Sequence, residues 1–147
     1  MRKLSVAAAF SLVEVTLALG IAAFCLIAVI GIIPVGVQTN RNATSQTAAT
    51  NVMAAVIADL RATPTTTNTS LQFAISFGTS GTQTRYFDGS GTASTSMTAN
   101  SRYRVDIRWS SAPTGLRYAD VKVWWPAAAT AANASGSTEM FAAFDRN

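Results

Sequence analysis

The chain has 147 residues, a formal net charge of +4, no histidine and a single cysteine, Cys25. These numbers exclude His-based catalysis, His-ligated metal and an intrachain disulfide. The 11 basic and 7 acidic residues give too small an excess to indicate nucleic acid as a partner on charge alone, and the length is enough for one domain with a modest core.

Residues 10–33 form an apolar run in which Glu14 is the only charged side chain. A helix of these 24 residues would be about 36 Å long, enough to cross a hydrocarbon core of about 30 Å. Arg2 and Lys3 precede the run, and the positive-inside rule predicts that they stay in the cytoplasm. A secretory signal peptide fits less well, because the run is too long and the small residues at 7–9 come before it.

Glu14 is a costly residue for a membrane helix. A carboxylate costs about 2.5–3.5 kcal/mol at the helix centre and less near an end. A simple membrane anchor gains nothing from this carboxylate, whereas a helix that must align with neighbouring helices can use it to fix their positions. If the chain begins at Phe10, Glu14 lies one turn from the terminal amine. It can then neutralise the amine of an adjacent subunit and fix the axial offset. The alternative is a lone carboxylate beside the positive end of a helix.

The segment from Ala9 to Leu19, with the basic residues before it, resembles the class III signal of type IV pilins and type II secretion pseudopilins. The resemblance implies that prepilin peptidase cuts between Ala9 and Phe10 and that Phe10 becomes N-methylated. It also implies that Glu14 is the fifth mature residue and acts in assembly. The family usually has glycine before the cut, and the alanine found here implies slower cleavage at worst.

The helix is predicted to extend beyond the membrane, to about residue 62. An apolar stripe at helical spacing covers the last part, at Val52, Met53, Val56, Ile57 and Leu60, and we expect it to lie on a sheet. Gly31 and Pro34 predict a kink or a locally unwound turn, because proline removes a helical hydrogen bond. In the family, such residues allow the subunit to stretch; a plain kink at the membrane surface is the alternative.

Alternation of apolar and polar residues predicts that the remaining chain is mostly β-structure. The sequence predicts loops at residues 92–101 and 126–136. It also predicts that the strands at 103–109 and 117–125 form an antiparallel hairpin. The predicted fold class is α+β, with a long helix on an antiparallel sheet of four to five strands. The predicted parts are a leader (1–9), a transmembrane and assembly helix (10–36) and a globular domain (37–147). The expected strands are residues 71–77, 83–87, 103–109, 117–125 and 138–144.

The segment from Val121 to Pro126 is similar to a strand of I-type minor pseudopilins and PilV-type minor pilins. A narrower resemblance is to the Verru_Chthon cassette protein B group. That group shares the leader, the turn at residues 86–89 and the strand beginning Tyr103-Arg104-Val105. The resemblance implies a pilin-like fold and a minor subunit.

No enzymatic constellation is present, because the acids are scattered and no serine or threonine has an evident base partner. Asp88 precedes Gly89 and Gly91, and a turn is favoured there over a calcium site, which needs several carboxylates. We therefore predict no catalytic residue, no metal and no cofactor.

Arg102, Arg104 and Arg108 lie on one face of the 103–109 strand and could form a basic patch. Trp124, expected on the exposed face, could stack on bases, although a contact with a neighbouring subunit is favoured. The alternative is a solvated strand face with Asp106 and Asp120 as cross-strand partners. Nucleic acid is not the favoured partner.

The sequence thus predicts a structural subunit, and not an enzyme, of a pilus or pseudopilus. Its expected partners are prepilin peptidase, the bacterial inner membrane and other pilin or pseudopilin subunits. The N-terminus would be cytoplasmic and the assembled product a periplasmic or extracellular filament. Two alternatives stay open: an adhesive or DNA-binding module on the same anchor, and an uncleaved single-pass membrane protein.

Overall fold

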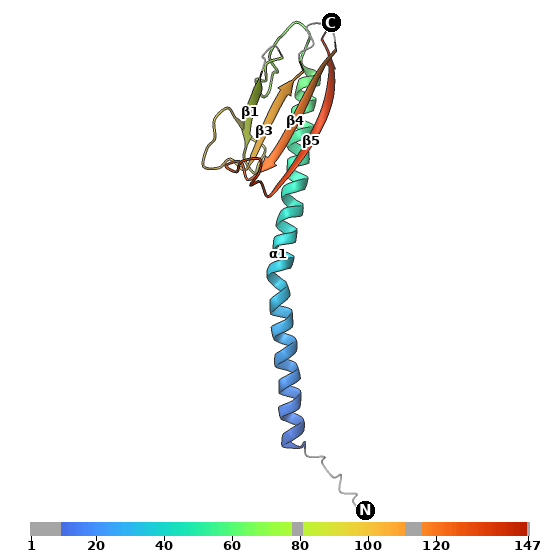
Figure 1. Cartoon of the computed structure of the whole chain (residues 1–147), viewed down its shortest axis with the longest axis vertical. Helices are drawn as coiled ribbons and strands as arrows, with labels where there is room; N and C mark the ends of the chain where they lie inside the picture. The colour runs from blue at the N-terminus through green and yellow to red at the C-terminus, as the bar shows by residue number, and fades with distance from the viewer. Residues whose placement is uncertain (1–9, 78–80, 111–115, 147) are drawn as a thin grey trace, which may run out of the picture. The chain divides into compact units, whose positions relative to one another are not determined.

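The structure is a computed structural model that describes residues 10–77, 81–110 and 116–146. It has one long helix and a five-stranded antiparallel sheet (Figure 1), which confirms the predicted α+β class. The chain divides into two compact units, residues 1–40 and 41–147, and α1 contributes to both. The elements are α1 (Leu12–Ala62), β1 (Thr82–Phe87), β2 (Ala93–Ser94), β3 (Tyr103–Trp109), β4 (Leu116–Trp125) and β5 (Gly136–Asp145).

Helix α1 agrees with the predicted span to within two residues at its start. The carbonyl oxygen of Ser11 accepts the N–H groups of Glu14, at 3.0 Å, and Val15, at 3.2 Å, which places Ser11 at the N-cap. The helix ends at Ala62, before Thr63-Pro64, because the residue before a proline is disfavoured in helical geometry.

The helix continues through the residues predicted to interrupt it. Gly31 and Pro34 both lie inside α1, and the helical assignment has no gap there. The locally unwound turn is therefore absent from this structure. Proline lacks only its own N–H, and the flanking residues keep their helical conformation. A kink at this point stays a prediction.

The sheet has the order β2-β1-β3-β4-β5, and every neighbouring pair is antiparallel. The predicted hairpin is confirmed, since Ile107 pairs with Val121 and the strands pair from Arg104 to Trp109. β4 and β5 pair continuously from Leu116 with Asp145 to Trp125 with Gly136. The predicted loop at residues 92–101 contains the two-residue strand β2, which pairs with the end of β1.

The core of the second unit lies between the sheet and the part of α1 that begins at residue 41. The predicted helical stripe is confirmed as the buried face of α1, with exposed fractions from 0% at Val56 to 7% at Val52. The inward side chains of the central strands are fully buried: Val105, Ile107, Val121 and Val123. This alternation of buried and exposed residues orients the sheet, leaving an outer face that points away from α1.

The predicted strand at residues 71–77 is wrong, although its apolar side chains Phe73, Ile75 and Phe77 are buried. Ala74 has a φ of 52°, in the left-handed region, which breaks an extended chain. The guanidinium of Arg85 holds this turn by donating to the carbonyl oxygens of Phe73, at 2.8 Å, and Ala74, at 2.5 Å. Side-chain hydrogen bonds and one isolated antiparallel bridge, Thr69 with Ser76, thus take the place of a longer strand ladder in this segment.

Candidate assembly site

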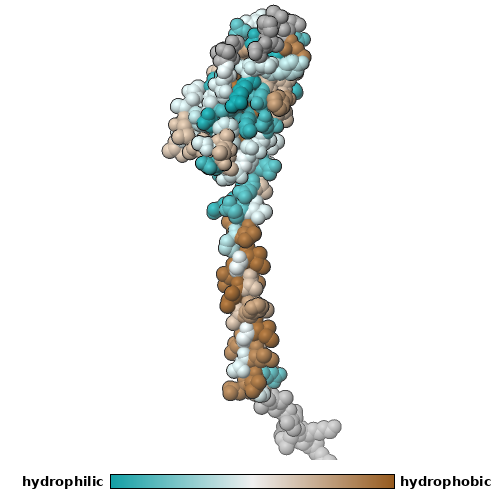
Figure 2. Space-filling view, viewed as in Figure 1, coloured by the Kyte–Doolittle hydropathy of each residue, from teal (hydrophilic) through white to brown (hydrophobic). Residues whose placement is uncertain are grey.

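The first part of α1 exposes almost nothing but apolar surface. Every large apolar side chain from Phe10 to Val37 is at least 44% exposed, and Leu12 reaches 82%. Figure 2 shows this segment as mostly brown with white patches between, whereas the visible face of the sheet unit is mostly white and teal. Among the described residues, α1 is the one helix long and apolar enough to cross a membrane. Apolar surface on this scale indicates contact with lipid or other protein chains.

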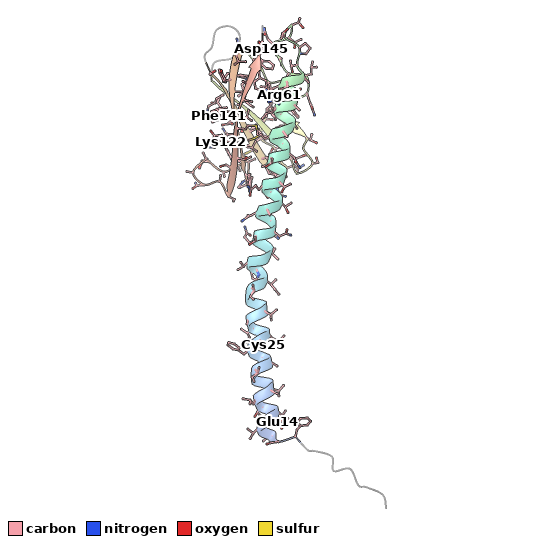
Figure 3. All side chains as sticks on the ribbon, turned by 90° about the vertical axis from the view of Figure 1, so that its right-hand side faces the viewer. Glu14, Cys25, Arg61, Lys122, Phe141 and Asp145 are labelled. Atoms are coloured by element: carbon pink, nitrogen blue, oxygen red, sulfur yellow. The ribbon has the colours of Figure 1, made fainter. Side chains whose placement is uncertain are left out.

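Glu14 lies in the first turn of α1 and is the acid of that turn (Figure 3). Ala18 and Ala22 follow it at intervals of four residues, so they lie on the same side of the helix. Small side chains at this spacing let a neighbouring helix approach closely. A shallow groove on this side is lined by Phe10, Glu14, Val15, Ala18, Leu19 and Ala22.

The spacing Ser11-x-x-Glu14 is that of a capping box, a signal that sequence reasoning missed. Glu14 occupies the N3 position, where the N-terminal end of the helix is positive. A carboxylate there is favourable even in an isolated subunit. The same position keeps it within one turn of Phe10, the residue predicted to carry the mature terminal amine.

Of the residues predicted for processing, Phe10 is described and is 79% exposed, immediately before α1. Ala9 lies outside the described residues, so the junction between the two stays a prediction. Cys25 is a free thiol on the exposed surface of the helix (Figure 3).

The outer face of the sheet carries interleaved charges of both signs. Arg104 Nε lies 3.1 Å from Asp106 Oδ1, and in the neighbouring strands Lys122 Nζ lies 3.2 Å from Glu139 Oε2. Arg108 pairs in register with Asp120. Each cation of this face therefore has a carboxylate beside it, which weakens its field toward solvent.

Arg102 does not belong to this face. Its Nη2 donates to Ser45 Oγ on α1 at 3.2 Å, so the side chain points toward the helix. The expected alignment of Arg102 with Arg104 and Arg108 is wrong. The residue precedes β3, and strand alternation does not control its direction.

The expectation that Trp124 is exposed is also wrong. Trp124 is only 6% exposed, although it lies on the outer face. The guanidinium of Arg104 lies over its ring, 4.9 Å from the ring centroid. A large ring on the outer face of a strand can be covered by a long side chain from the neighbouring strand. The alternation of apolar and polar residues does not predict such covering. The ring is not available for stacking on bases.

Asp88 forms the turn predicted for it. Its Oδ1 accepts the N–H of Ser90 and the N–H of Thr92, both at 2.9 Å, and the hydroxyl of Ser90 at 2.7 Å. The Ser90 hydroxyl and then the Thr92 N–H hold the pKa of this carboxyl below its usual value. Across the described ranges, no group of three or more Cys, Asp or Glu side chains is placed to hold a metal ion.

Asp59 is a structural residue that sequence reasoning missed. It is 8% exposed, and its two oxygens accept the N–H groups of Gln72 and Phe73, both at 3.0 Å. This pairing attaches the irregular segment after α1 to the helix. A carboxylate between the apolar stripe residues Ile57 and Leu60 was the available signal, because a buried carboxylate needs hydrogen-bond donors.

Comparison of the chain with protein-family models, with curated proteins and with solved structures gives no match in any of the three. What the chain does must therefore be inferred from its own residues and geometry.

Proposed function

We propose that this chain is a structural subunit of a type IV pilus or type II secretion pseudopilus, processed by prepilin peptidase and assembled through α1. One observation carries the proposal. The exposed, apolar first part of α1 carries a single carboxylate, Glu14, four residues after Phe10 and the Ala9–Phe10 junction that resembles a prepilin signal. A lipid anchor explains the apolar surface, and helix capping favours an acid at Glu14, but neither gives a reason for the junction that precedes them.

Assembly accounts for both features. In the membrane, lipid covers the apolar side chains, and in a filament the helices of other subunits would cover them. Ala18 and Ala22 allow close packing on the side that carries Glu14. A neighbour in the correct axial position brings its terminal amine to Glu14. In any other position the carboxylate is buried without a partner, which costs several kcal/mol. The pair therefore selects one axial offset among many apolar packings of similar energy.

The rest of the proposal follows from the resemblance of the leader. The subunit would enter the bacterial inner membrane with a cytoplasmic N-terminus and the sheet unit outside. Prepilin peptidase would cut after Ala9, and Phe10 would be N-methylated. The product would be a periplasmic or extracellular filament in which this chain is a minor subunit. The α+β fold, with a helix laid on an antiparallel sheet, supports this proposal.

A DNA-binding module on the same anchor is not favoured. The cations of the outer face have carboxylate neighbours, and Trp124 is buried beneath Arg104. Phosphate binding needs cations that are not already neutralised, and base stacking needs an open ring.

The processing step is tested by mass spectrometry of the N-terminus of the protein purified from its native membrane. We expect a chain that starts at methyl-Phe10. An Ala9→Gly variant should be processed at least as fast, and an Ala9→Leu variant should keep its leader. A native chain that retains residues 1–9 would contradict the proposal.

The assembly role is tested by Glu14→Ala and Glu14→Gln. Both variants should enter the membrane and lose their leader normally, but incorporation into sheared filaments should fall at least tenfold. Asp88→Asn is the matched control, because it removes a carboxylate from a surface turn of the sheet unit and leaves α1 unchanged. Normal incorporation of the Glu14 variants would show that the carboxylate does not set the axial offset.

A further inference from the structure

Arg41 is the one charged residue that the sequence places in α1 between Glu14 and Asp59. Residues 15–37 carry no charge, and as a helix they are about 34 Å long, close to a hydrocarbon core of about 30 Å. Arg41 follows Val37 by four residues, which is about 6 Å of helix. The headgroup layer of a bilayer is about 5–7 Å deep on each side. A membrane-spanning α1 would therefore place Arg41 at the level of the lipid phosphates.

A second guanidinium approaches α1 one turn further along. Arg102 directly precedes β3, and its Nη2 donates to Ser45 Oγ at 3.2 Å. Ser45 follows Arg41 by four residues, so the two lie on the same side of the helix. Ser45 is 6% exposed, whereas Arg41 and Arg102 are both exposed. The buried hydroxyl thus holds Arg102 against α1 and leaves its side chain accessible. We call Arg41 and Arg102 the basic pair.

Among the described residues, no carboxylate neutralises the basic pair. The ion pairs in the described ranges lie on the outer face of the sheet and include neither arginine. Asp88 lies at the same end of the sheet, since the N–H of Arg102 donates to the carbonyl oxygen of Phe87 at 2.8 Å. Its Oδ1, however, already accepts hydrogen bonds within its own turn, from Ser90 and Thr92. Two cations on one side of a helix repel each other, and a bound anion would relieve that repulsion.

We propose that the basic pair binds the phosphate group of an anionic phospholipid, in the leaflet on the side of the sheet unit. Guanidinium groups donate two parallel hydrogen bonds to phosphate oxygens and are well suited to this group. The depth of Arg41 favours a lipid over free phosphate, because phosphate groups are concentrated in the headgroup layer. Net negative charge favours an anionic lipid, because the ammonium of a zwitterionic headgroup would add a third cation beside the pair.

The inference rests on one part of the proposed function, that the apolar part of α1 lies in a membrane. It does not depend on cleavage after Ala9 or on assembly into a filament. The competing anion is a carboxylate of a second copy of the chain. Such a contact needs two chains, whereas lipid binding needs one, so the stoichiometry separates them.

The test uses native mass spectrometry of the full chain, released from nonionic detergent micelles that contain phosphatidylglycerol or phosphatidylcholine. We expect one phosphatidylglycerol to bind saturably to a single chain, at least fivefold more tightly than phosphatidylcholine. Glycerol 3-phosphate at the same concentration should not displace it. A higher concentration of ammonium acetate should weaken it, because the pair is exposed and its field is screened by salt.

Variants assign the preference to the basic pair. Arg41→Gln and Arg102→Gln should each weaken phosphatidylglycerol binding about fivefold and leave phosphatidylcholine binding unchanged. Ser45→Ala keeps both charges but removes the acceptor that positions Arg102, so it should weaken binding about twofold to fivefold. Arg108→Gln is the matched control, because it removes the same charge from an exposed arginine at the other end of β3. It should leave lipid binding unchanged.

Three outcomes would overturn the proposal. The two lipids could bind equally, Arg108→Gln could weaken binding as much as Arg41→Gln, or glycerol 3-phosphate could displace the lipid. Dimers that dissociate in Arg41→Gln, with no lipid bound to the parent chain, would assign the pair to a second copy instead. A chain that retains its leader should bind the lipid equally well, and a correctly processed chain can fail to bind it. The failure of this proposal and that of the proposed function are therefore distinguishable.

Discussion

Replacing Asp59 with asparagine should destabilise the sheet unit far more than its single-atom change suggests. Both carboxylate oxygens of Asp59 accept backbone N–H groups, from Gln72 and Phe73, at 3.0 Å. Phe73 is 5% exposed, and its ring packs against that of Phe87 with centroids 5.1 Å apart. The carboxylate therefore holds in place a segment that has no strand ladder of its own.

The magnitude follows from these two bonds. A hydrogen bond to a charged group contributes about 1.5–3 kcal/mol, and a buried N–H left without a partner adds a desolvation cost of similar size. Asparagine keeps one acceptor oxygen and directs an NH₂ group at the second N–H. We therefore expect Asp59→Asn to cost about 2–3 kcal/mol, less than the loss of both bonds because the N–H of Gln72 is only partly buried. For a unit of this size, that corresponds to a decrease in Tm of roughly 10 °C.

Intrinsic fluorescence provides a local assay, because Trp109, Trp124 and Trp125 all lie in the second unit. Thermal unfolding of the full chain, followed at the tryptophans, then reports on that unit alone. Asp88→Asn is the matched control, since Asp88 also accepts two backbone N–H groups but lies in a partly exposed turn. Its decrease in Tm should be much smaller. Equal decreases for the two variants would refute the role of burial in this reasoning.

Two further predictions concern the sheet. A Cβ atom on Gly136 would overlap the six-membered ring of Trp125. Gly136→Ala should therefore lower the free energy of unfolding by about 1–3 kcal/mol and change the near-UV circular dichroism spectrum. Gly89→Ala is the control and should change neither quantity, because the space around Gly89 is open. Burial and the neighbouring Glu139 raise the pKa of Asp120 above 3.8, so ionisation destabilises the fold as pH rises through the raised value. Asp120→Asn should therefore raise Tm at pH 7 and leave it unchanged at pH 3. A lower Tm at pH 7 would show that the attraction of the Asp120 carboxylate to Arg108 and Lys122 dominates.

The sequence by itself determined the features that depend on local pattern. The apolar run, the helical stripe from Val52 to Leu60 and the alternation along residues 103–109 and 117–125 predicted the corresponding elements. Helical and strand periodicities depend only on residues that are close together in the sequence, so they can be recognised without knowledge of distant contacts. Glu14 stood out for the same reason, as one charge in an apolar run.

Tertiary structure decided the features that depend on residues far apart in the chain. The alternation at residues 71–77 correctly predicted that Phe73, Ile75 and Phe77 are buried, whereas Leu71 is exposed. Asp59 and Arg85 bind backbone groups there, and no strand forms. Arg104 covers Trp124, and the sheet order leaves the β5 edge open. Periodicity reports on which face of an element a side chain lies, whereas which distant group satisfies a backbone or covers a ring is fixed only when the chain folds.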